Sequence, residues 1–273
     1  MSETIVDDLR WEARSRGAGV PLLLLHGFLG RGSGWGAHAT ALARHFRVIV
    51  VDLPGHGRSG IPGDPARASV ERTADDLAAI LRREGCSPAH VLGYSLGARV
   101  ALRLAVAHPD AVRRLVLESP SAGLATQMER RARRDADEDR AARLERDGIN
   151  IFVDEWEREP VFASQVSLAA APARRLRAER LRNRPAGLSA SLRGAGQGSM
   201  EPLHERLAEV QAPTLVIAGA LDPTGRTRAV QVAKGIPGAR LEVVTGAGHA
   251  PHLETPRTFR SLALAFLKED SAA

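Results

Sequence analysis

Short apolar segments alternate with amphipathic segments along most of this chain. The apolar segments, rich in Leu, Val and Ile, cover residues 21–26, 46–52, 90–93, 112–118, 214–218 and 240–244. Apolar positions recur with helical spacing in residues 69–84, 96–107, 225–234 and 256–267. Strands that alternate with helices in this way are typical of a mostly parallel sheet with helices on both faces. We therefore predict an α/β fold.

The alternation stops between residues 122 and 199. Residues 128–146 are nearly all Ala, Arg, Asp and Glu, which favours a charged helix, and sheet-like sequence returns at Ala212. We predict an α/β core made of residues 1–121 and 200–273, with residues 122–199 inserted as a helical cap. The alternative is a solvated bundle of surface helices that has no part in the functional site.

The composition agrees with a large globular core. The chain has 273 residues, of which 44% are hydrophobic, and this suits one α/β domain with an insertion or two domains. A single cysteine, Cys86, excludes an intramolecular disulfide. The first residues do not have the pattern of a signal peptide, and the apolar stretch 20–25 is too short to span a membrane. We expect a cytoplasmic protein, and the sequence does not indicate an oligomeric state.

The net charge of +6 would favour an acidic partner. Nearly all of the basic residues are arginines, since lysine occurs only at positions 234 and 268. No arginine run is interleaved with aromatic residues in the manner of a nucleic-acid-binding surface. We therefore expect a small-molecule ligand and no nucleic acid.

The segment Gly93-Tyr94-Ser95-Leu96-Gly97 follows a predicted strand and precedes a predicted helix. This is the setting of the G-x-S-x-G nucleophile elbow, in which a sharp turn presents the serine hydroxyl above the sheet. The glycines allow a backbone turn that a Cβ would block. Ser95 is therefore the candidate reactive residue.

A serine hydroxyl needs a histidine to take its proton, and the histidine needs a carboxylate to orient it. With this elbow the expected chain order is Ser, then Asp or Glu, then His. Asp222 and His249 both follow predicted strands, at the sheet edge where α/β proteins bind their ligands. Asp222 could alternatively cap a helix, since Pro223 follows it, and His252 is the rival histidine. We predict Ser95, His249 and Asp222 as the catalytic triad.

Backbone N–H groups near the elbow are candidates for an oxyanion hole. Leu96 follows the serine, and Phe28 lies in the loop after the early strand, from which a second N–H is expected. Two such donors would stabilise negative charge on one substrate oxygen. We interpret His26 and the segment of residues 51–59 as scaffold around this site, with the alternative that residues 51–59 line it.

Together these motifs resemble the α/β-hydrolase superfamily over essentially the whole chain. A narrower resemblance rests on Gly93–Arg99 and on cap motifs. These motifs are Glu118–Leu124, Trp156 followed by Pro160–Ser164, and Leu181–Arg184. The set is similar to the 2-succinyl-6-hydroxy-2,4-cyclohexadiene-1-carboxylate synthases of menaquinone biosynthesis, a lyase family on a hydrolase fold.

The resemblance implies an elimination of pyruvate. The substrate would be 2-succinyl-5-enolpyruvyl-6-hydroxy-3-cyclohexene-1-carboxylate, and Ser95 would act as a base and not as an acylated nucleophile. Residues implied to bind the several substrate carboxylates or to line the site are Arg99, Arg133, Arg182, Tyr94 and Trp156. The other cap arginines Arg131, Arg134 and Arg140 are expected on a solvated face. Arginine suits a polycarboxylate because it binds carboxylates in bidentate geometry.

Two other functions remain open on these residues. A serine hydrolase of an ester, lactone or carbon–carbon bond would use the same triad, but an apolar ester would favour an apolar cap. A non-enzymatic ligand receptor can share the fold, although an intact Ser, His and Asp set argues against it. Neither a metal nor a cofactor is expected, since there is no cysteine pair and His249 and His252 lack a helical metal-binding context.

Overall fold

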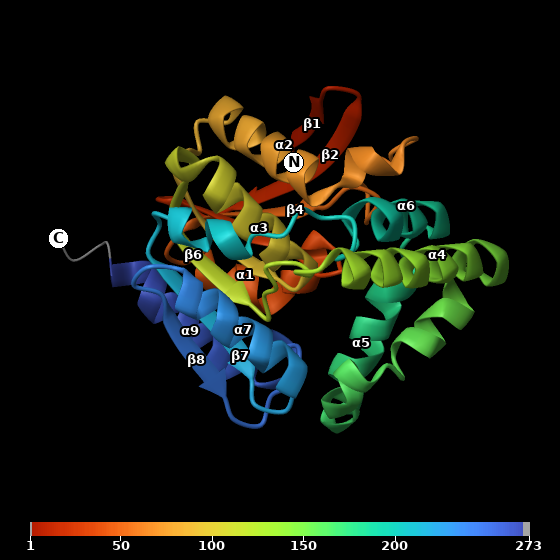
Figure 1. The fold of residues 1–273 in the computed structure, drawn as a ribbon. Coiled ribbons are helices and arrows are strands. Elements are labelled where there is room, and N and C mark those ends of the chain that lie inside the picture. The colour runs from red at the N-terminus through yellow and green to blue at the C-terminus, as the bar shows by residue number, and fades with distance from the viewer. Residues whose placement is uncertain (1, 270–273) are drawn as a thin grey trace.

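This computed structural model describes residues 2–269. The described residues include one sheet of eight strands (Figure 1). The strands are β1 (Ser2–Val6), β2 (Leu9–Arg16), β3 (Pro21–Leu25), β4 (Arg47–Asp52), β5 (Ala89–Tyr94), β6 (Val112–Glu118), β7 (Thr214–Gly219) and β8 (Arg240–Val244). Their spatial order is β1-β2-β4-β3-β5-β6-β7-β8. The pairs β1–β2 and β2–β4 are antiparallel, and every other pair is parallel.

Helices cover both faces of this sheet. The α-helices are α1 (Gly36–Leu42), α2 (Val70–Arg83), α3 (Leu96–Ala107), α4 (Gln127–Trp156), α5 (Ala170–Leu181), α6 (Pro185–Ala195), α7 (Pro223–Gly235), α8 (Pro251–Glu254) and α9 (Pro256–Lys268). The 3-10 helices are η1 (Gly32–Trp35), η2 (Pro65–Ala68), η3 (Pro109–Ala111), η4 (Pro160–Ser167) and η5 (His204–Glu209).

The leucines of β3 show how the sheet separates two apolar clusters. Leu23 and Leu25 pack into the cluster that holds α2, α3 and α7, whereas Leu22 and Leu24 pack into the cluster that holds α1 and α9. Successive side chains of a strand point to opposite faces, so a continuous apolar run is needed where both faces are buried. The mostly parallel sheet with helices on both faces, predicted from the sequence, is confirmed.

The first two strands were not anticipated by the apolar segments. In β2 only alternate positions are buried, at Leu9, Trp11 and Ala13, and charged residues separate them. The strand is antiparallel to β4 and lies near the sheet edge, so it lacks the continuous apolar run of the central strands. The prediction of the sheet was therefore incomplete at this edge.

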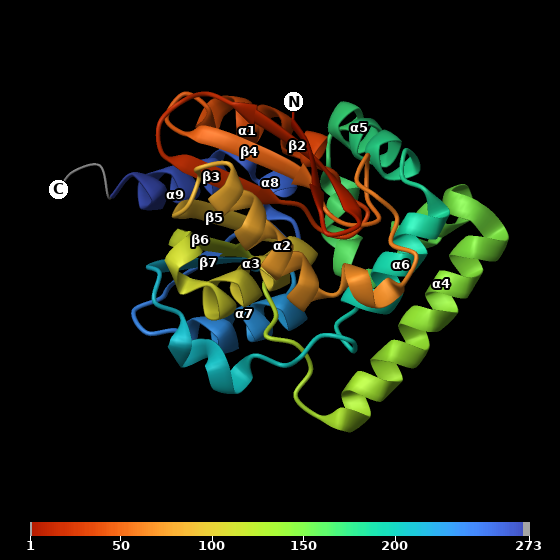
Figure 2. The same cartoon turned by 90° about the horizontal axis from the view of Figure 1, so that it is seen from above.

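Helices α4, α5 and α6 lie together on one side of the sheet and its covering helices (Figures 1 and 2). Helix α4 begins with a capping box, in which Thr126 and Glu129 each bond the other's backbone N–H. Its helical geometry is broken at Gly148, where φ is 82°. The three helices fall within the segment 122–199 that the sequence analysis assigns to a cap.

The cap helices have an apolar cluster of their own and are tied to the core by close contacts. Leu144, Phe152 and Leu188 pack together, with Leu29 supplied by the core. Asn183 accepts a hydrogen bond from Gly57 N–H at 3.0 Å and donates one to the Leu29 carbonyl at 2.9 Å. These contacts fix the cap over the loops that follow β3 and β4.

None of the helices formed by residues 2–269 combines the length and the apolar character that crossing a membrane requires.

Gly187 of α6 and Gly55 of the core touch through their backbones, and a Cβ on either residue would collide with the other's carbonyl group. We predict that Gly187→Ala lowers the free energy of unfolding by about 1–3 kcal/mol, the usual cost of overpacking, although alanine favours helices. Gly34→Ala is the matched control, since its Cβ would enter open space. Urea unfolding measures both variants, and equal stability of the two would contradict the proposed close packing.

Candidate active site

Ser95 stands at a sharp turn between β5 and α3. Its φ of 51° and ψ of −106° lie in a region that residues with a Cβ rarely adopt. A Cβ on Gly93 would collide with the backbone of Gly97, and a Cβ on Gly97 would collide with the carbonyl of Leu25. The glycines thus let β3, β5 and α3 approach one another closely. The turn places Ser95 in the wall of a cavity at the carboxyl end of the sheet.

The Ser95, His249 and Asp222 side chains form a connected set. His249 Nε2 lies 3.1 Å from Ser95 Oγ, and His249 Nδ1 lies 2.7 Å from Asp222 Oδ2. Asp222 Oδ1 accepts a hydrogen bond from Gly225 N–H at 2.8 Å, so Asp222 also caps α7. Both readings of Asp222 from the sequence, triad member and helix cap, therefore describe its contacts.

Electrostatics keep the Asp222 carboxyl ionised. Burial opposes ionisation, but the hydrogen bonds from His249 and from Gly225 N–H outweigh it and hold the pKa of Asp222 below its ordinary value. An ionised Asp222 accepts the Nδ1–H of His249, which leaves Nε2 to accept the Ser95 proton. The geometry can therefore support proton transfer from Ser95.

His252, the rival histidine, points elsewhere. Its Nδ1 lies 2.9 Å from Glu118 Oε1 in the buried interior, and its ring packs on Tyr94 with centroids 4.6 Å apart. The Tyr94 ring also lies 5.7 Å from the His249 ring, so Tyr94 is close to both histidines. Burial raises the pKa of the Tyr94 hydroxyl, which keeps this residue neutral.

Phe28 and Leu96, the expected oxyanion-hole donors, both line the cavity. Leu96 is the first residue of α3, where a backbone N–H has no acceptor within the helix. His26 supports the Phe28 loop, because its Nδ1 lies 2.8 Å from the Gly27 carbonyl and its Nε2 accepts from Leu53 N–H at 3.0 Å. This placement agrees with the scaffold role expected for His26.

The cavity has a volume of about 470 Å³ and lies between the core and the cap. Aromatic side chains from both the core and the cap form one wall of the cavity, called here the aromatic wall. Trp156 packs on Phe28 with ring centroids 5.1 Å apart and on Phe162 at 5.5 Å, and Phe162 lies 5.9 Å from His249. Tyr94 and Trp156, both expected at the site, line the cavity.

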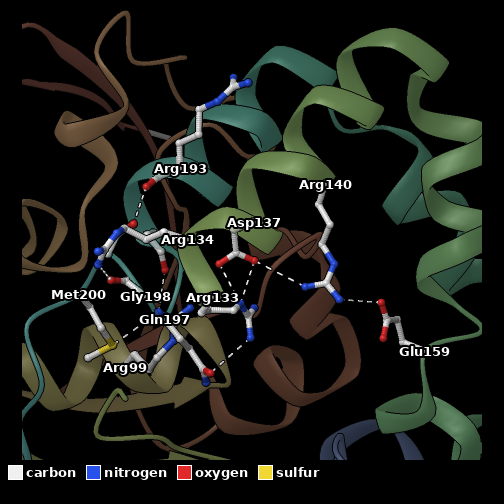
Figure 3. A network of polar contacts seen from close by, with 12 residues as sticks. Arg99, Arg133, Arg134, Asp137, Arg140, Glu159, Arg193, Gln197, Gly198 and Met200 are labelled. Carbon is white, nitrogen blue, oxygen red and sulfur yellow. Dashed lines mark hydrogen bonds and ion pairs between the residues drawn. The ribbon is translucent and has the colours of Figure 1, made fainter. Parts of the chain in front are cut away.

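Arg99 also lines the cavity, one turn beyond Ser95 on α3. The side chain is buried, and its Nη1 donates to the Ala195 carbonyl at 2.7 Å and lies 3.6 Å from Met200 Sδ (Figure 3). Burial, followed by repulsion from Arg133, lowers the pKa of Arg99 to about 10. Arg99 therefore remains a cation near neutral pH without a carboxylate bonded to it among the described residues.

A second group of charges lies on α4. Arg133 Nε donates to both oxygens of the buried Asp137, each at 2.9 Å, and its Nη1 lies 3.5 Å from Gln197 Oε1 (Figure 3). Arg140 lies 3.6 Å from Asp137 and 2.9 Å from Glu159. Arg133, Asp137 and Arg140 share one helix face because they are four and then three residues apart. The four charged residues Arg133, Asp137, Arg140 and Glu159 all line the cavity.

The structure places two arginines differently from the expectation based on the sequence. Arg140 lines the cavity and is not on a solvated face, because two helical turns bring it onto the same side as Arg133. Arg182 is absent from the cavity wall; its side chain is 68% exposed and pairs with Glu179 at 3.5 Å. Helix α5 ends at Leu181, and the turn that follows directs Asn183, not Arg182, toward the core.

Arg228 was missed by the sequence analysis. It lies on α7, six residues beyond Asp222, and it lines the cavity. The sequence could have indicated this position. A helix that begins directly after Asp222 keeps its second turn, which includes Arg228, close to Asp222. The cavity therefore presents Arg99, Arg133, Arg140 and Arg228 from three different helices.

Comparisons with known proteins extend over nearly the whole chain. The alpha/beta hydrolase fold family matches residues 20–256. The chain is 37% identical to a Bacillus subtilis protein provisionally named 2-succinyl-6-hydroxy-2,4-cyclohexadiene-1-carboxylate synthase, with 97% of both chains aligned. It is 32% identical to the synthase of that name from Pectobacterium atrosepticum, over 90% of this chain and 93% of the relative. The solved structure of MenH from S. aureus superposes with a TM-score of 0.90 at 32% identity, covering 96% of this chain and 98% of the other.

From the contact between Ser95 and His249 we predict that the Ser95 hydroxyl is reactive. A fluorophosphonate reagent should label Ser95 in the wild type, because His249 increases the nucleophilicity of the hydroxyl. His249→Ala should slow labelling by about a hundredfold or more, the usual contribution of a positioned general base. Mass spectrometry of the labelled peptide gives both the rate and the site.

His45→Ala is the control, because His45 is exposed and does not line the cavity. Labelling of a different serine, or equal rates in the His249→Ala and His45→Ala variants, would be incompatible with this assignment.

Proposed function

Since the chain belongs to the α/β-hydrolase fold family, we propose that it is a lyase that eliminates pyruvate from a polycarboxylate substrate. The proposed reaction converts 2-succinyl-5-enolpyruvyl-6-hydroxy-3-cyclohexene-1-carboxylate to 2-succinyl-6-hydroxy-2,4-cyclohexadiene-1-carboxylate, a step of menaquinone biosynthesis. The names of the relatives support this reaction. A cytoplasmic location belongs to the same proposal.

The observation that carries the proposal is the buried Arg99 beside a complete Ser–His–Asp set in one cavity. A hydrolase of apolar esters would gain nothing from a buried cation one turn beyond its serine, and burying it costs free energy. A substrate with three carboxylates, one on the ring, one on the succinyl group and one on the enolpyruvyl group, would supply the missing negative charge.

In the proposed mechanism Ser95 acts as a base, with His249 accepting its proton and Asp222 stabilising the resulting imidazolium. Ser95 removes the ring proton next to the succinyl ketone. The electron pair forms a new ring double bond, the existing one shifts, and the bond from the ring to the enolpyruvyl oxygen breaks. His249 returns a proton, and the released enolpyruvate becomes pyruvate.

The N–H groups of Phe28 and Leu96 are proposed to hold the ketone oxygen while the proton leaves. Negative charge then develops on that oxygen, and preorganised donors stabilise it more strongly than water does. The aromatic wall around Trp156 would exclude water from the ring. This division of roles leaves the arginines to position the carboxylates.

Pyruvate release from the cyclohexene substrate, followed with lactate dehydrogenase and NADH, tests the proposal. We expect turnover by the wild type and a loss of about a thousandfold or more in Ser95→Ala and in His249→Ala. The double variant should be no slower than the single variants, because the residues act as a unit.

A second substrate and a test for acylation of Ser95 separate a lyase from a hydrolase. A lyase should release the phenol of a simple aryl ester with a kcat/KM far below that for pyruvate release, and it should form no covalent ester on Ser95 during turnover. Stoichiometric acylation of Ser95 by the cyclohexene substrate, detected by mass spectrometry, would favour the serine hydrolase.

In the proposed function Arg99 binds a substrate carboxylate, so loss of its side chain should lower kcat/KM. We predict that Arg99→Ala lowers kcat/KM by about ten- to a hundredfold, the range for hydrogen bonds to charged groups, and that Arg99→Lys recovers part of the loss. Arg182→Ala is the control, since the Arg182 side chain is exposed and outside the cavity wall. If Arg99→Ala retains the kcat/KM of Arg182→Ala, the polycarboxylate assignment is wrong.

A further inference from the structure

The arginines of the cavity wall divide into two kinds. Arg133 and Arg140 are neutralised by Asp137 and Glu159, through contacts of 2.9 to 3.6 Å. These residues form a chain of alternating charge on α4 and at the start of η4 (Figure 3). Two cations and two anions leave no net charge in this part of the wall.

Arg99 and Arg228 are different, because neither has a carboxylate of residues 2–269 bound to it. Arg99 donates to a carbonyl oxygen and approaches a thioether sulfur, which are neutral groups. In the described part of the chain, Arg228 has neither a hydrogen bond nor an ion pair to its guanidinium. The wall therefore holds two positive charges that the protein itself does not pair.

These cations are held where their charge is unfavourable. Burial, and after it repulsion from Arg133, lowers the pKa of Arg228. Arg228 in turn opposes the charge of Arg99, so Arg99, Arg133 and Arg228 all repel one another. Asp222 attracts Arg228, but its oxygens bond His249 and Gly225. Arg99 is buried and Arg228 is half-buried, and an unpaired charge that is wholly or partly removed from water is costly, so a ligand anion at this position would be favoured.

The two cations line the same cavity as the triad, on the two helices that begin directly after Ser95 and Asp222. Arg99 shares α3 with the elbow of Ser95, and Arg228 shares α7 with its cap residue Asp222. Both guanidinium groups are attached to helices of the core and not to the cap. A ligand that binds both would therefore have its position fixed relative to Ser95 and His249.

We propose that Arg228 is a substrate-binding residue that works with Arg99 as a two-point clamp for a dianion. Each arginine takes one carboxylate of the same ligand, and the part of the ligand between them lies across Ser95. This inference rests on the proposed function for the identity of the natural substrate, but the ligand class it names, a molecule with two separated carboxylates, follows from the cavity. Arg228 would determine specificity for a second carboxylate.

Binding of simple diacids tests the clamp without turnover. The probes are the α,ω-dicarboxylates from succinate to suberate and the monomethyl ester of each, titrated by isothermal calorimetry into the full chain. We expect the wild type to bind at least one diacid more tightly than its monomethyl ester. Arg228→Gln should weaken that diacid by about ten- to a hundredfold and remove the preference, and Arg228→Lys should retain part of it.

Arg226→Gln is the matched control. Arg226 lies on the same helix, is exposed and does not line the cavity, so its loss changes the net charge equally. Circular dichroism confirms folding, and Arg228→Lys keeps the test valid if Arg228→Gln is unstable. Equal diacid affinity in Arg228→Gln and Arg226→Gln, or a wild type without preference for any diacid, overturns the clamp.

Pyruvate release separates this inference from the proposed function. Diacid binding that depends on Arg228, in a protein that releases no pyruvate, would support the clamp and refute the lyase. Pyruvate release with the same kcat/KM in Arg228→Gln and Arg226→Gln would support the lyase and refute the clamp.

Discussion

The close approach of β3, β5 and α3 at Gly93 and Gly97 is the constraint on which the active site depends. Without side chains at these positions the backbones can touch, and Ser95 is forced into a positive φ at the start of α3. Strain of this kind persists only where surrounding packing enforces it, and here the buried leucines of β3 supply that packing. His249 and Asp222 need only reach a serine whose position is already fixed.

Charge in the cavity is organised by one buried carboxylate. Asp137 is nearly inaccessible to water, and it holds Arg133 through two hydrogen bonds and attracts Arg140. It therefore neutralises part of the cap, so that the number of arginines in the wall overstates the positive charge offered to a ligand. The cations without such a partner among the described residues belong to the core helices α3 and α7, which begin directly after Ser95 and Asp222.

Residues of α4, η4 and α6, within the segment predicted as a cap, form one side of this charged cavity. The position of the cap depends on backbone contacts, such as that between Gly55 and Gly187, and on the hydrogen bonds of Asn183 to two core loops. The aromatic contacts from Phe28 through Trp156 and Phe162 to His249 then join cap and core directly around the serine. Movement of the cap would thus change the surroundings of the triad.

The sequence alone determined the parallel part of the sheet, the elbow at Ser95 and the pairing of Ser95 with His249 and Asp222. These features depend on local patterns: apolar runs fix strands, glycines fix the turn, and parallel strands bring their carboxyl ends to one edge. Only the tertiary structure decided which arginines line the cavity. Whether Arg140, Arg182 or Arg228 reaches the cavity depends on the rotation of each helix about its axis and on where α5 ends. The sequence of a charged helix does not show which of its charged side chains face solvent and which face a cavity. The edge strand β2 was missed for a related reason, since a half-buried strand needs only alternate apolar residues.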